Sequence, residues 1–206
     1  YGFVFRACLF ANNATGFSGD NNNGPYKYFY NCTFADNTTA LYRGSNSWAP
    51  VYYLKNCLLV RNGTAVSLTS GPSMAYLVRF YANGWFGNTK NVSLTNWQNE
   101  SGCSGFGRGA YLGPQYYADP KLDAAGRPQA GSPVIGLGVD LSDDSVESVS
   151  VDLYGAPWNG VYDFGCVKAT APAAAKLDEV YVATTGDDAN SGASEDAAKR
   201  TVSAAL

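Results

Sequence analysis

Apolar and polar positions alternate along the first hundred residues, and the alternation recurs at a fixed interval. The phrases NCTFADNTTALY, from Asn31, and NCLLVRNGTAVSL, from Asn56, share a cysteine and, five residues later, an asparagine. Short alternating segments bounded by Asn, Asp and Gly are typical of β-strands joined by turns. The pattern therefore predicts several short strands that return once in every repeat.

Aligning the repeats on the cysteine places four copies in one frame. The steps are 24, 25 and 21 residues when they are measured on Cys8, Cys32, Cys57 and Val78. The apolar columns are then Phe5, Phe29, Leu54 and Ala75 before the cysteine, and Phe10, Phe34, Leu59 and Phe80 after it. A repeat of this length predicts a solenoid in which each repeat forms one coil and like residues stack at about the 4.8 Å strand spacing. Leucine-rich repeats are the chief alternative, and these copies hold too few leucines.

Two further columns have a structural interpretation. The asparagine column is predicted to form a hydrogen-bonded ladder at a bend, where Asn also tolerates a left-handed backbone; its members are Asn13, Asn37, Asn62 and Asn83. The cysteines are expected to be buried and reduced, and a bridge between Cys103 and Cys166 is left open. Six Asn-x-Ser/Thr triplets are interpreted as turn chemistry rather than glycan acceptors: Asn13, Asn31, Asn37, Asn62, Asn91 and Asn99.

The composition of the chain changes from about Tyr111, where Gly, Pro and Asp become frequent. Four phrases stand out in this segment: ADPKLD (118–123), QAGSPVIGLGVD (129–140), DLYGAPW (152–158) and VYDFGCVK (161–168). They resemble the closing segment of bacterial extracellular right-handed parallel β-helix proteins of the pectate-lyase-like superfamily. Together with the repeats, the resemblance covers about residues 1–168. It implies an all-β, right-handed parallel β-helix outside the cell or on its surface, and it carries no activity of its own.

A second resemblance follows an Ala/Pro-rich stretch. The tail EVYVATTGDDANSGASEDAAKRTVSAAL is similar to the opening phrase of the same family, in which a strand, a loop and a short helix cap the N-terminal mouth of the β-helix. We therefore expect β-helix coils over 1–110, a closing segment over 111–168, an Ala/Pro linker over 169–177 and a capping tail over 178–206.

The order of these segments has two explanations. The chain is either cut from a tandem array of β-helices, or its tail caps the open mouth of a neighbouring copy. The sequence enters coil residues at once, and uncovered strand edges favour aggregation. Capping from copy to copy would be head-to-tail and would grow a filament. The candidate contact residues in the tail are Val180, Tyr181, Val182, Val202 and Leu206.

Composition narrows the classes of function. Charged residues make up 15% of the chain, the net charge is −3 and histidine is absent. We expect no nucleic-acid partner, because no Lys/Arg cluster is present, and no membrane insertion, because no apolar run reaches about 18 residues. The absence of histidine removes the commonest general base and metal ligand.

Catalytic chemistry has little support in the repeats. Polysaccharide-cleaving enzymes of this fold require clustered carboxylates, and Asp20 and Asp36 are the only ones before Glu100. Whether the chain is an enzyme is left open, with the balance against it, and no cofactor is expected. A weak calcium site at Asp140, Asp143 and Asp144 competes with a solvated loop.

Outward columns offer the best candidate contacts. Arg6, Tyr30, Lys55 and Tyr76 share one column, and Val4, Tyr28, Tyr53 and Met74 share the next. Tyrosines and cations in such a stripe could hold sugar rings, pack against another chain, or stabilise their own sheet. Trp48, Trp85 and Trp97 are assigned to loops. The sequence thus favours a structural unit of an extracellular filament, surface array or adhesin; the alternative is a carbohydrate-binding or polysaccharide-cleaving β-helix.

Overall fold

The computed structural model describes residues 2–19, 26–43, 52–69, 78–95 and 114–169, together with residue 189. Every regular element in these ranges is a β-strand, and they contain no helix. The chain divides into two compact units, Tyr1–Ala171 and Pro172–Leu206. The fold described below is that of the first unit, and the predicted capping tail lies almost wholly outside the described residues.

Twelve strands form four coils of three strands each, and a thirteenth follows them. The first coil contains β1 (Phe3–Arg6), β2 (Leu9–Ala11) and β3 (Thr15–Gly19). The second contains β4 (Lys27–Tyr30), β5 (Thr33–Ala35) and β6 (Thr39–Arg43). The third contains β7 (Tyr52–Lys55), β8 (Leu58–Val60) and β9 (Thr64–Thr69). The fourth contains β10 (Val78–Tyr81), β11 (Asn83–Phe86) and β12 (Lys90–Thr95), and β13 is Gln115–Tyr116.

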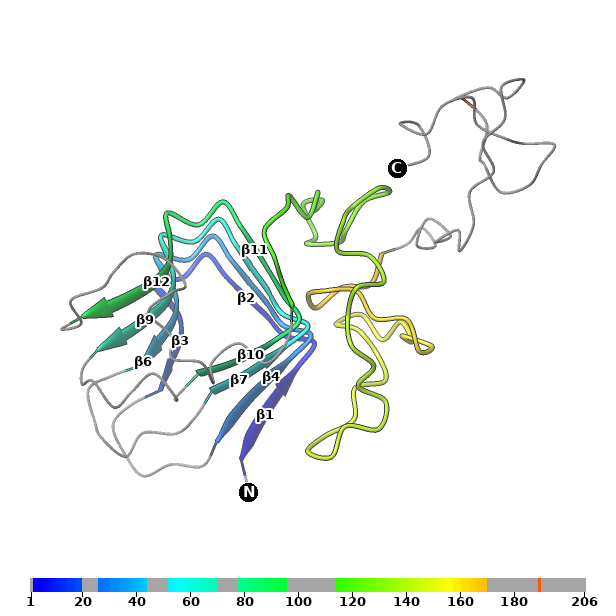
Figure 1. Ribbon diagram of the computed structural model, residues 1–206, viewed down its shortest axis with the longest axis horizontal. Helices are drawn as coiled ribbons and strands as arrows, with labels where there is room; N and C mark the ends of the chain where they lie inside the picture. The colour runs from blue at the N-terminus through cyan, green and yellow to red at the C-terminus, as the bar shows by residue number, and fades with distance from the viewer. Residues whose placement is uncertain are drawn as a thin grey trace. The chain divides into compact units, whose positions relative to one another are not determined.

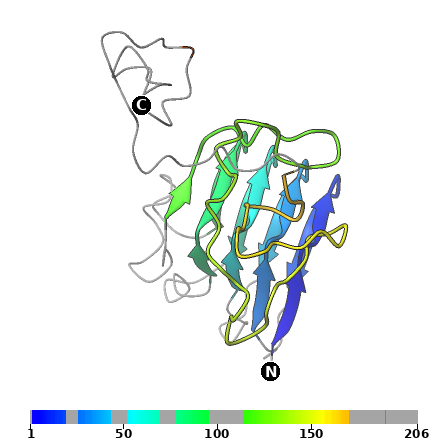
Figure 2. The same ribbon diagram turned by 90° about the vertical axis from the view of Figure 1, so that its right-hand side faces the viewer.

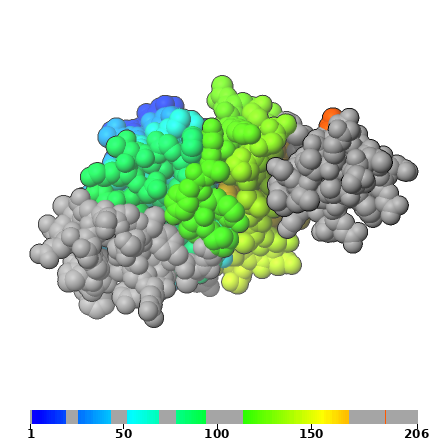
Figure 3. All heavy atoms as spheres, turned by 45° about the horizontal axis from the view of Figure 1, so that its top comes forward, coloured from blue at the N-terminus to red at the C-terminus, as the bar shows by residue number. Residues whose placement is uncertain are grey.

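The strands assemble into three parallel sheets. Sheet A has the order β1-β4-β7-β10, sheet B the order β13-β11-β8-β5-β2, and sheet C the order β12-β9-β6-β3. Each strand therefore pairs with the equivalent strand of the next coil, and the three sheets surround a common interior (Figure 1). The coils follow one another in chain order along the stack (Figure 3). The prediction of an all-β solenoid of stacked parallel strands is confirmed for the described residues.

The predicted alignment of the fourth repeat is wrong. Val78 pairs with Tyr52 and Gly84 with Leu58, a step of 26 residues instead of 21. Asn83, not Val78, therefore lies opposite Cys57. The alignment on Val78 matched one apolar position, whereas strand pairing is decided by the inward face of all three strands at once.

The corrected alignment completes the core columns. Phe80 joins the column of Phe5, Phe29 and Leu54, and Trp85 joins that of Phe10, Phe34 and Leu59. Trp85 is thus a buried strand residue and not a loop residue as predicted; Trp48 and Trp97 lie outside the described residues. Equivalent rings stack face to face, with centroids 5.0 Å apart for Phe5 and Phe29 and 4.7 Å apart for Phe10 and Phe34. Apolar burial of this kind is the main source of stability in the coils.

Each coil turns its corners through residues with a left-handed backbone. The corner between the first and second strands is occupied by Ala7, Asn31, Asn56 and Ala82, and the corner after the second strand by Asn12, Asp36, Arg61 and Gly87; all have positive φ. Asn, Asp and Gly tolerate this conformation, whereas Ala and Arg do so at a cost. The left-handed residue at the second corner precedes the ladder asparagine, so the ladder residue itself is not the one that adopts this conformation.

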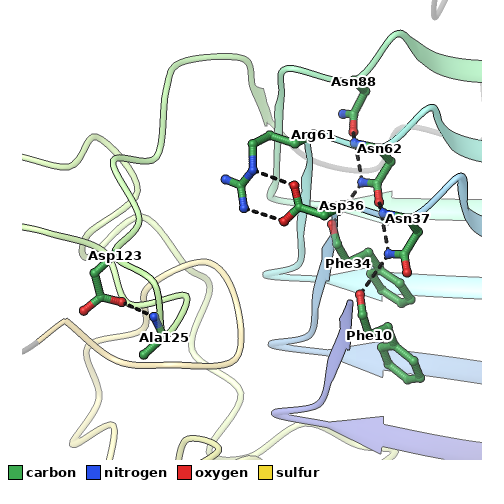
Figure 4. Close-up of polar contacts among 9 residues, drawn as sticks. All are labelled: Phe10, Phe34, Asp36, Asn37, Arg61, Asn62, Asn88, Asp123 and Ala125. Carbon is green, nitrogen blue, oxygen red and sulfur yellow. Dashed lines mark hydrogen bonds and ion pairs between the residues drawn. The ribbon is translucent and has the colours of Figure 1, made fainter. Parts of the chain in front are cut away.

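The asparagine ladder runs along this second corner, and Figure 4 shows its upper members. The Asn37 amide donates to Asn62 Oδ1 at 3.0 Å, and the Asn62 amide donates to Asn88 Oδ1 at 2.9 Å. The Asn13 amide donates to Asn37 Oδ1 at 3.3 Å. The fourth member is therefore Asn88, and the predicted Asn83 instead accepts a bond from the Cys57 N–H at 2.8 Å. Buried amides must be paired in this way because an unpaired one is costly.

Burial in the coils determines which of the Asn-x-Ser/Thr triplets are accessible. Asn37 and Asn62 are buried, as is Asn31, whose amide donates to the Asp163 carbonyl at 2.9 Å. A glycan cannot be attached to a buried, hydrogen-bonded amide without unfolding the corner. These three triplets therefore act as corner residues in the folded coils.

The closing segment, residues 114–169, crosses the strands on one side of the coils (Figure 2). Beyond the two-residue strand β13 it contains only two isolated bridges, Leu122 with Pro128 and Val151 with Pro157. It packs on the coils through Leu141, Val149, Trp158 and Tyr162, which surround the fully buried Tyr30.

Each bridge closes a hairpin built around an aspartate, and the two hairpins have the same form. They were not predicted from the sequence. LDAAGRP (122–128) and VDLYGAP (151–157) share Asp, Gly and Pro at identical spacing. In each hairpin the aspartate Oδ1 accepts two backbone N–H groups, from Ala125 and Arg127 in the first and from Tyr154 and Ala156 in the second. The glycine has positive φ in both, 78° at Gly126 and 83° at Gly155, where a side chain would be strained.

Candidate functional site

The outward face of sheet A carries the candidate contact residues in two columns. Strand pairing aligns Arg6, Tyr30, Lys55 and Tyr81 in the first, and Val4, Tyr28, Tyr53 and Arg79 in the second. Tyr81 and Arg79 thus take the places predicted for Tyr76 and Met74, for the same reason that the fourth repeat was misaligned. Tyr76 itself lies outside the described residues.

Three residues of the first column, Arg6, Tyr30 and Lys55, contact the closing segment of their own chain. Lys55 forms an ion pair with Asp144, and Arg6 forms one with Glu147. The Tyr30 hydroxyl donates to Asp144 Oδ1 at 3.0 Å, and Tyr30 is fully buried. The Lys55 ammonium also lies over the Tyr30 ring, 5.0 Å from its centroid. One prediction was that these side chains pack against another chain. The contacts observed are instead with the closing segment of the same chain.

Burial and the nearby carboxylate alter the pKa values of this column. Burial raises the pKa of the Tyr30 hydroxyl, and its bond to the Asp144 carboxylate raises the pKa further. Burial alone would also raise the pKa of Asp144. The bonds that Asp144 accepts from Lys55, the Val146 N–H and Tyr30 outweigh burial and hold its pKa below 3.8. Asp144 is thus a carboxylate at neutral pH, and Tyr30 is a neutral donor.

The second column remains partly open to solvent and forms an aromatic cluster. The Tyr28 and Tyr53 rings stack with centroids 4.9 Å apart and an interplanar angle of 15°. Tyr26, which is 50% exposed, places its ring edge-on to both, at 6.3 Å from Tyr28 and 5.8 Å from Tyr53. Burial raises the pKa of both Tyr28 and Tyr53, so their hydroxyls stay protonated at neutral pH.

Two cavities lie between the closing segment and the coils, beside β1. One, of about 350 Å³, is lined by Gly2, Val4, Tyr26 and Tyr28 on the coil side and by Ser145–Glu147 on the other. The second, of about 360 Å³, is lined by Arg6, Ala7 and Cys8 and by residues of the stretch 148–153. Both outward residues of β1, Val4 and Arg6, therefore border open space.

The three aspartates predicted as a weak calcium site have different surroundings. Asp144 bonds to Lys55, a cation. Asp140 Oδ1 accepts the Ser142 N–H at 2.8 Å, and this bond lowers the pKa of Asp140. Asp143 is exposed. Within the described residues, no three His, Cys, Asp or Glu side chains are grouped as a metal site would require.

The cysteines are arranged as a core column. Cys32 Sγ donates to the Phe5 carbonyl at 3.3 Å and Cys57 Sγ to the Phe29 carbonyl at 3.2 Å, one coil earlier in each case. Cys8, Cys32, Cys57 and Cys166 are free thiols, and Cys103 lies outside the described residues. Burial raises the pKa of Cys166 to about 11 and raises that of Cys32. These thiols are therefore protonated at neutral pH, and the thiol form is a poor nucleophile.

The first coil presents an end on which no described strand pairs. β1, β2 and β3 are each the outermost strand of their sheet. Phe3 is 57% exposed, whereas its equivalent in the third coil, Tyr52, is fully buried. The tail residues predicted to cover this end, 180–182, 202 and 206, lie outside the described residues.

Sequence reasoning missed the residues that attach the closing segment. Asp163 is buried and accepts the Gly136 N–H at 2.8 Å and the Ala169 N–H at 2.7 Å. Asp152 is buried and accepts three N–H groups, including that of Lys168 at 2.9 Å. Ala169 is therefore still packed in the closing segment, although it was assigned to the linker. The repeated Asp-x-x-Gly-x-Pro phrase was the available signal for Asp152; Asp163 had none.

Comparison of the chain with protein-family models, with curated proteins and with solved structures finds no match. The resemblance to the pectate-lyase-like superfamily therefore stays a prediction. No helix of the described residues has the length and apolarity needed to cross a bilayer.

Proposed function

We propose that this chain is a structural unit of an extracellular assembly, built as a right-handed parallel β-helix whose first coil receives the tail of a neighbouring copy. The observation that carries the proposal is the end of the stack at β1, β2 and β3, where no described strand covers the edges. Edges of this kind pair readily with a further strand. The tail phrase from Glu179 alternates as a strand does and resembles a β-helix cap.

The charge and chemistry of the outward face support the same proposal. Lys55 and Arg6 are neutralised by carboxylates of the closing segment, so the face is not arranged as a cationic substrate groove. Burial raises the pKa of the Cys32 and Cys166 thiols, and within the described residues no three His, Cys, Asp or Glu side chains are grouped. Adhesin, surface array and filament are the assemblies this architecture would serve, and the filament follows most directly because head-to-tail contacts do not close.

The test compares the full chain with a variant that lacks 172–206. The full chain is expected to form oligomers or filaments whose mass rises with concentration in light scattering and which are visible by electron microscopy. The shortened chain is expected to lose them. A full-length variant with Val180→Asp and Val182→Asp keeps the whole chain and is also expected to lose the assemblies. It controls for a loss of solubility or folding that the deletion itself would cause. Assemblies that persist unchanged in both variants would refute the proposal.

Carbohydrate binding is the second candidate, and the Tyr26–Tyr28–Tyr53 cluster beside its cavity is the observation that favours it. Aromatic rings bind the apolar faces of sugars, and Glu147 and Ser145 at the cavity wall offer hydrogen-bonding groups. A glycan array on the full chain, repeated with Tyr26→Ala, tests it. Binding that the variant loses supports a sugar site, and an array without binding removes the candidate.

A further inference from the structure

The backbone of β1 shows which groups would receive a further strand. The N–H groups of Phe3 and Ala7 donate to the carbonyls of Tyr26 and Tyr30, at 2.8 and 2.9 Å. Alternate residues of a parallel strand direct their backbone groups to opposite neighbours. The N–H and C=O groups of Val4 and Arg6 therefore face the other edge, where no described strand pairs with β1.

The side chains of β1 define what a further strand must carry. Phe3 and Phe5 belong to inward columns, since their partners Tyr52 and Leu54 in the third coil are fully buried. Phe3 is covered on one side by the Lys27 ammonium, 4.2 Å from its centroid, and is otherwise open. A strand that continues the core must therefore place an apolar residue beside Phe5, and an apolar residue beside Phe3 would cover the open side of its ring.

The outward side of β1 imposes a second condition. Val4 opens into the cavity of about 350 Å³, which extends to the ring of Tyr28 and to Val146. Arg6 is already paired with Glu147 and borders the cavity of about 360 Å³. The residue beside Val4 can thus be large and aromatic, and the residue beside Arg6 must leave the ion pair intact.

We propose that residues 180–183 of a second copy add to β1 as a parallel strand, with Val180 beside Phe3, Tyr181 beside Val4, Val182 beside Phe5 and Ala183 beside Arg6. This inference rests on the function proposed above and specifies the contact. Both valines then continue the inward phenylalanine columns. Tyr181 enters the cavity beside Val4, which separates it from Tyr28, and the small Ala183 spares the ion pair of Arg6.

Other registers place fewer apolar side chains beside the two phenylalanines. A shift of one residue turns both valines outward and sets Tyr181 with Ala183, or Glu179 with Tyr181, beside them, because side chains alternate with a period of two. A shift that sets Val180 beside Phe5 places the charged Asp178 beside Phe3. The opposite shift sets Thr184 beside Phe5 and leaves Val180 beyond the strand. The register with Tyr181 beside Val4 is therefore the one that sets a valine beside each phenylalanine.

The decisive experiment replaces Tyr181 of the full chain with a photo-reactive benzoyl-phenylalanine and mixes two differently tagged copies. Cross-links between copies are expected to map by mass spectrometry to the stretch 2–4, to Tyr28 or to 145–147. The same photo-reactive residue at Tyr154, which is exposed on the closing segment, is the control and is expected to give no such cross-link. Cross-links from Tyr181 that map elsewhere, or only within one copy, would overturn the inference.

A backbone variant provides the second test. Val4→Pro removes an N–H that faces the open edge and spares those that bond to β4, so the coil is expected to fold. Self-association of this full-length variant should fall at least tenfold in sedimentation analysis, whereas Val4→Ala, which keeps the N–H, should associate within about threefold of the parent chain. Circular dichroism checks that both variants are folded.

The two proposals fail separately. Association that is lost on deletion of 172–206 but is kept in Val4→Pro leaves the assembly function intact and refutes the contact on β1. Association that survives the deletion refutes the assembly function together with this contact.

Discussion

The coils and the closing segment satisfy their backbone groups in different ways. In the coils, the strands bond to the equivalent strands one coil away, and the corner amides repeat the same bonds from coil to coil. In residues 114–169, buried aspartates accept the N–H groups of irregular turns, as Asp152 and Asp163 do. A fault in a coil therefore affects two neighbours, whereas a fault in the closing segment affects one turn.

The comparison predicts that a ladder residue in the middle of the stack is the most sensitive site. Asn62→Ala would remove the acceptor of the buried Asn37 N–H and of the Asn37 side-chain amide. Each stranded buried group costs roughly 1–3 kcal/mol, so we expect a loss of about 3 kcal/mol in the free energy of unfolding. Urea denaturation measures it.

The ladder also contains the control for this substitution. Asn13 is exposed and stands at the end of the ladder, so Asn13→Ala should cost less than about 1 kcal/mol. Equal losses at the two positions would show that the ladder is not cooperative along the stack.

The two aspartate hairpins supply the next prediction. Asp152 is buried and accepts three N–H groups, whereas Asp123 is less buried and its Oδ1 accepts two, from Ala125 and Arg127. Asp152→Ala should cost about 2 kcal/mol and Asp123→Ala about 1 kcal/mol. Hydrogen exchange should rise over 150–168 in the first variant only, with the coils unchanged. Faster exchange throughout the coils would contradict the local character of the closing segment.

Acid is expected to loosen the closing segment before the coils. The pKa of Asp144 in the folded chain lies below its ordinary 3.8 because Lys55, the Val146 N–H and Tyr30 outweigh the effect of burial. The bonds of the carboxylate therefore stabilise the fold above pH 3.8 and are lost as the pH falls below it. Asp144→Asn should cost about 1 kcal/mol at pH 7 and should flatten the fall in stability between pH 4 and 2. An acid limb identical to that of the parent chain would exclude Asp144 as its source.

The smallest effect is expected at the surface of the coils. Arg61 and Asp36 form a bidentate ion pair between neighbouring corners, with both side chains well exposed (Figure 4). Asp36→Asn keeps a residue that tolerates the left-handed corner and should cost at most about 0.5 kcal/mol. The difference should vanish in 1 M salt, where charges are screened. A salt-independent loss would mean that the corner geometry of Asp36, and not its charge, is what matters.

The coils were predictable because their chemistry repeats. A column such as Phe5, Phe29 and Leu54 reports its own partners, since equivalent positions stack. The prediction failed at the fourth coil, where Cys57 faces Asn83 and the ladder continues through Asn88. The ladder asparagine of the fourth coil is Asn88, five residues after the predicted Asn83. Only simultaneous pairing of all three strands distinguishes these two alignments.

The candidate site was predictable only in part. The outward columns were correctly placed through Tyr28, Tyr30, Tyr53 and Lys55. The burial of Tyr30 by the closing segment and the ion pair of Asp144 with Lys55 were not predicted. Asp144 lies 114 positions from Tyr30 and 89 from Lys55, and no periodicity connects them. The aspartate hairpins had a visible repeat that escaped notice.

The sequence by itself determined the parallel coils, because a period of apolar and asparagine positions can bury its apolar face only by stacking on copies of itself. It determined that Cys32 and Cys57 would be core residues for the same reason. Tertiary structure alone decided which outward residues stay accessible. The closing segment buries Tyr30 and leaves Tyr28 partly exposed, because the difference depends on aspartates and apolar residues brought from distant parts of the chain.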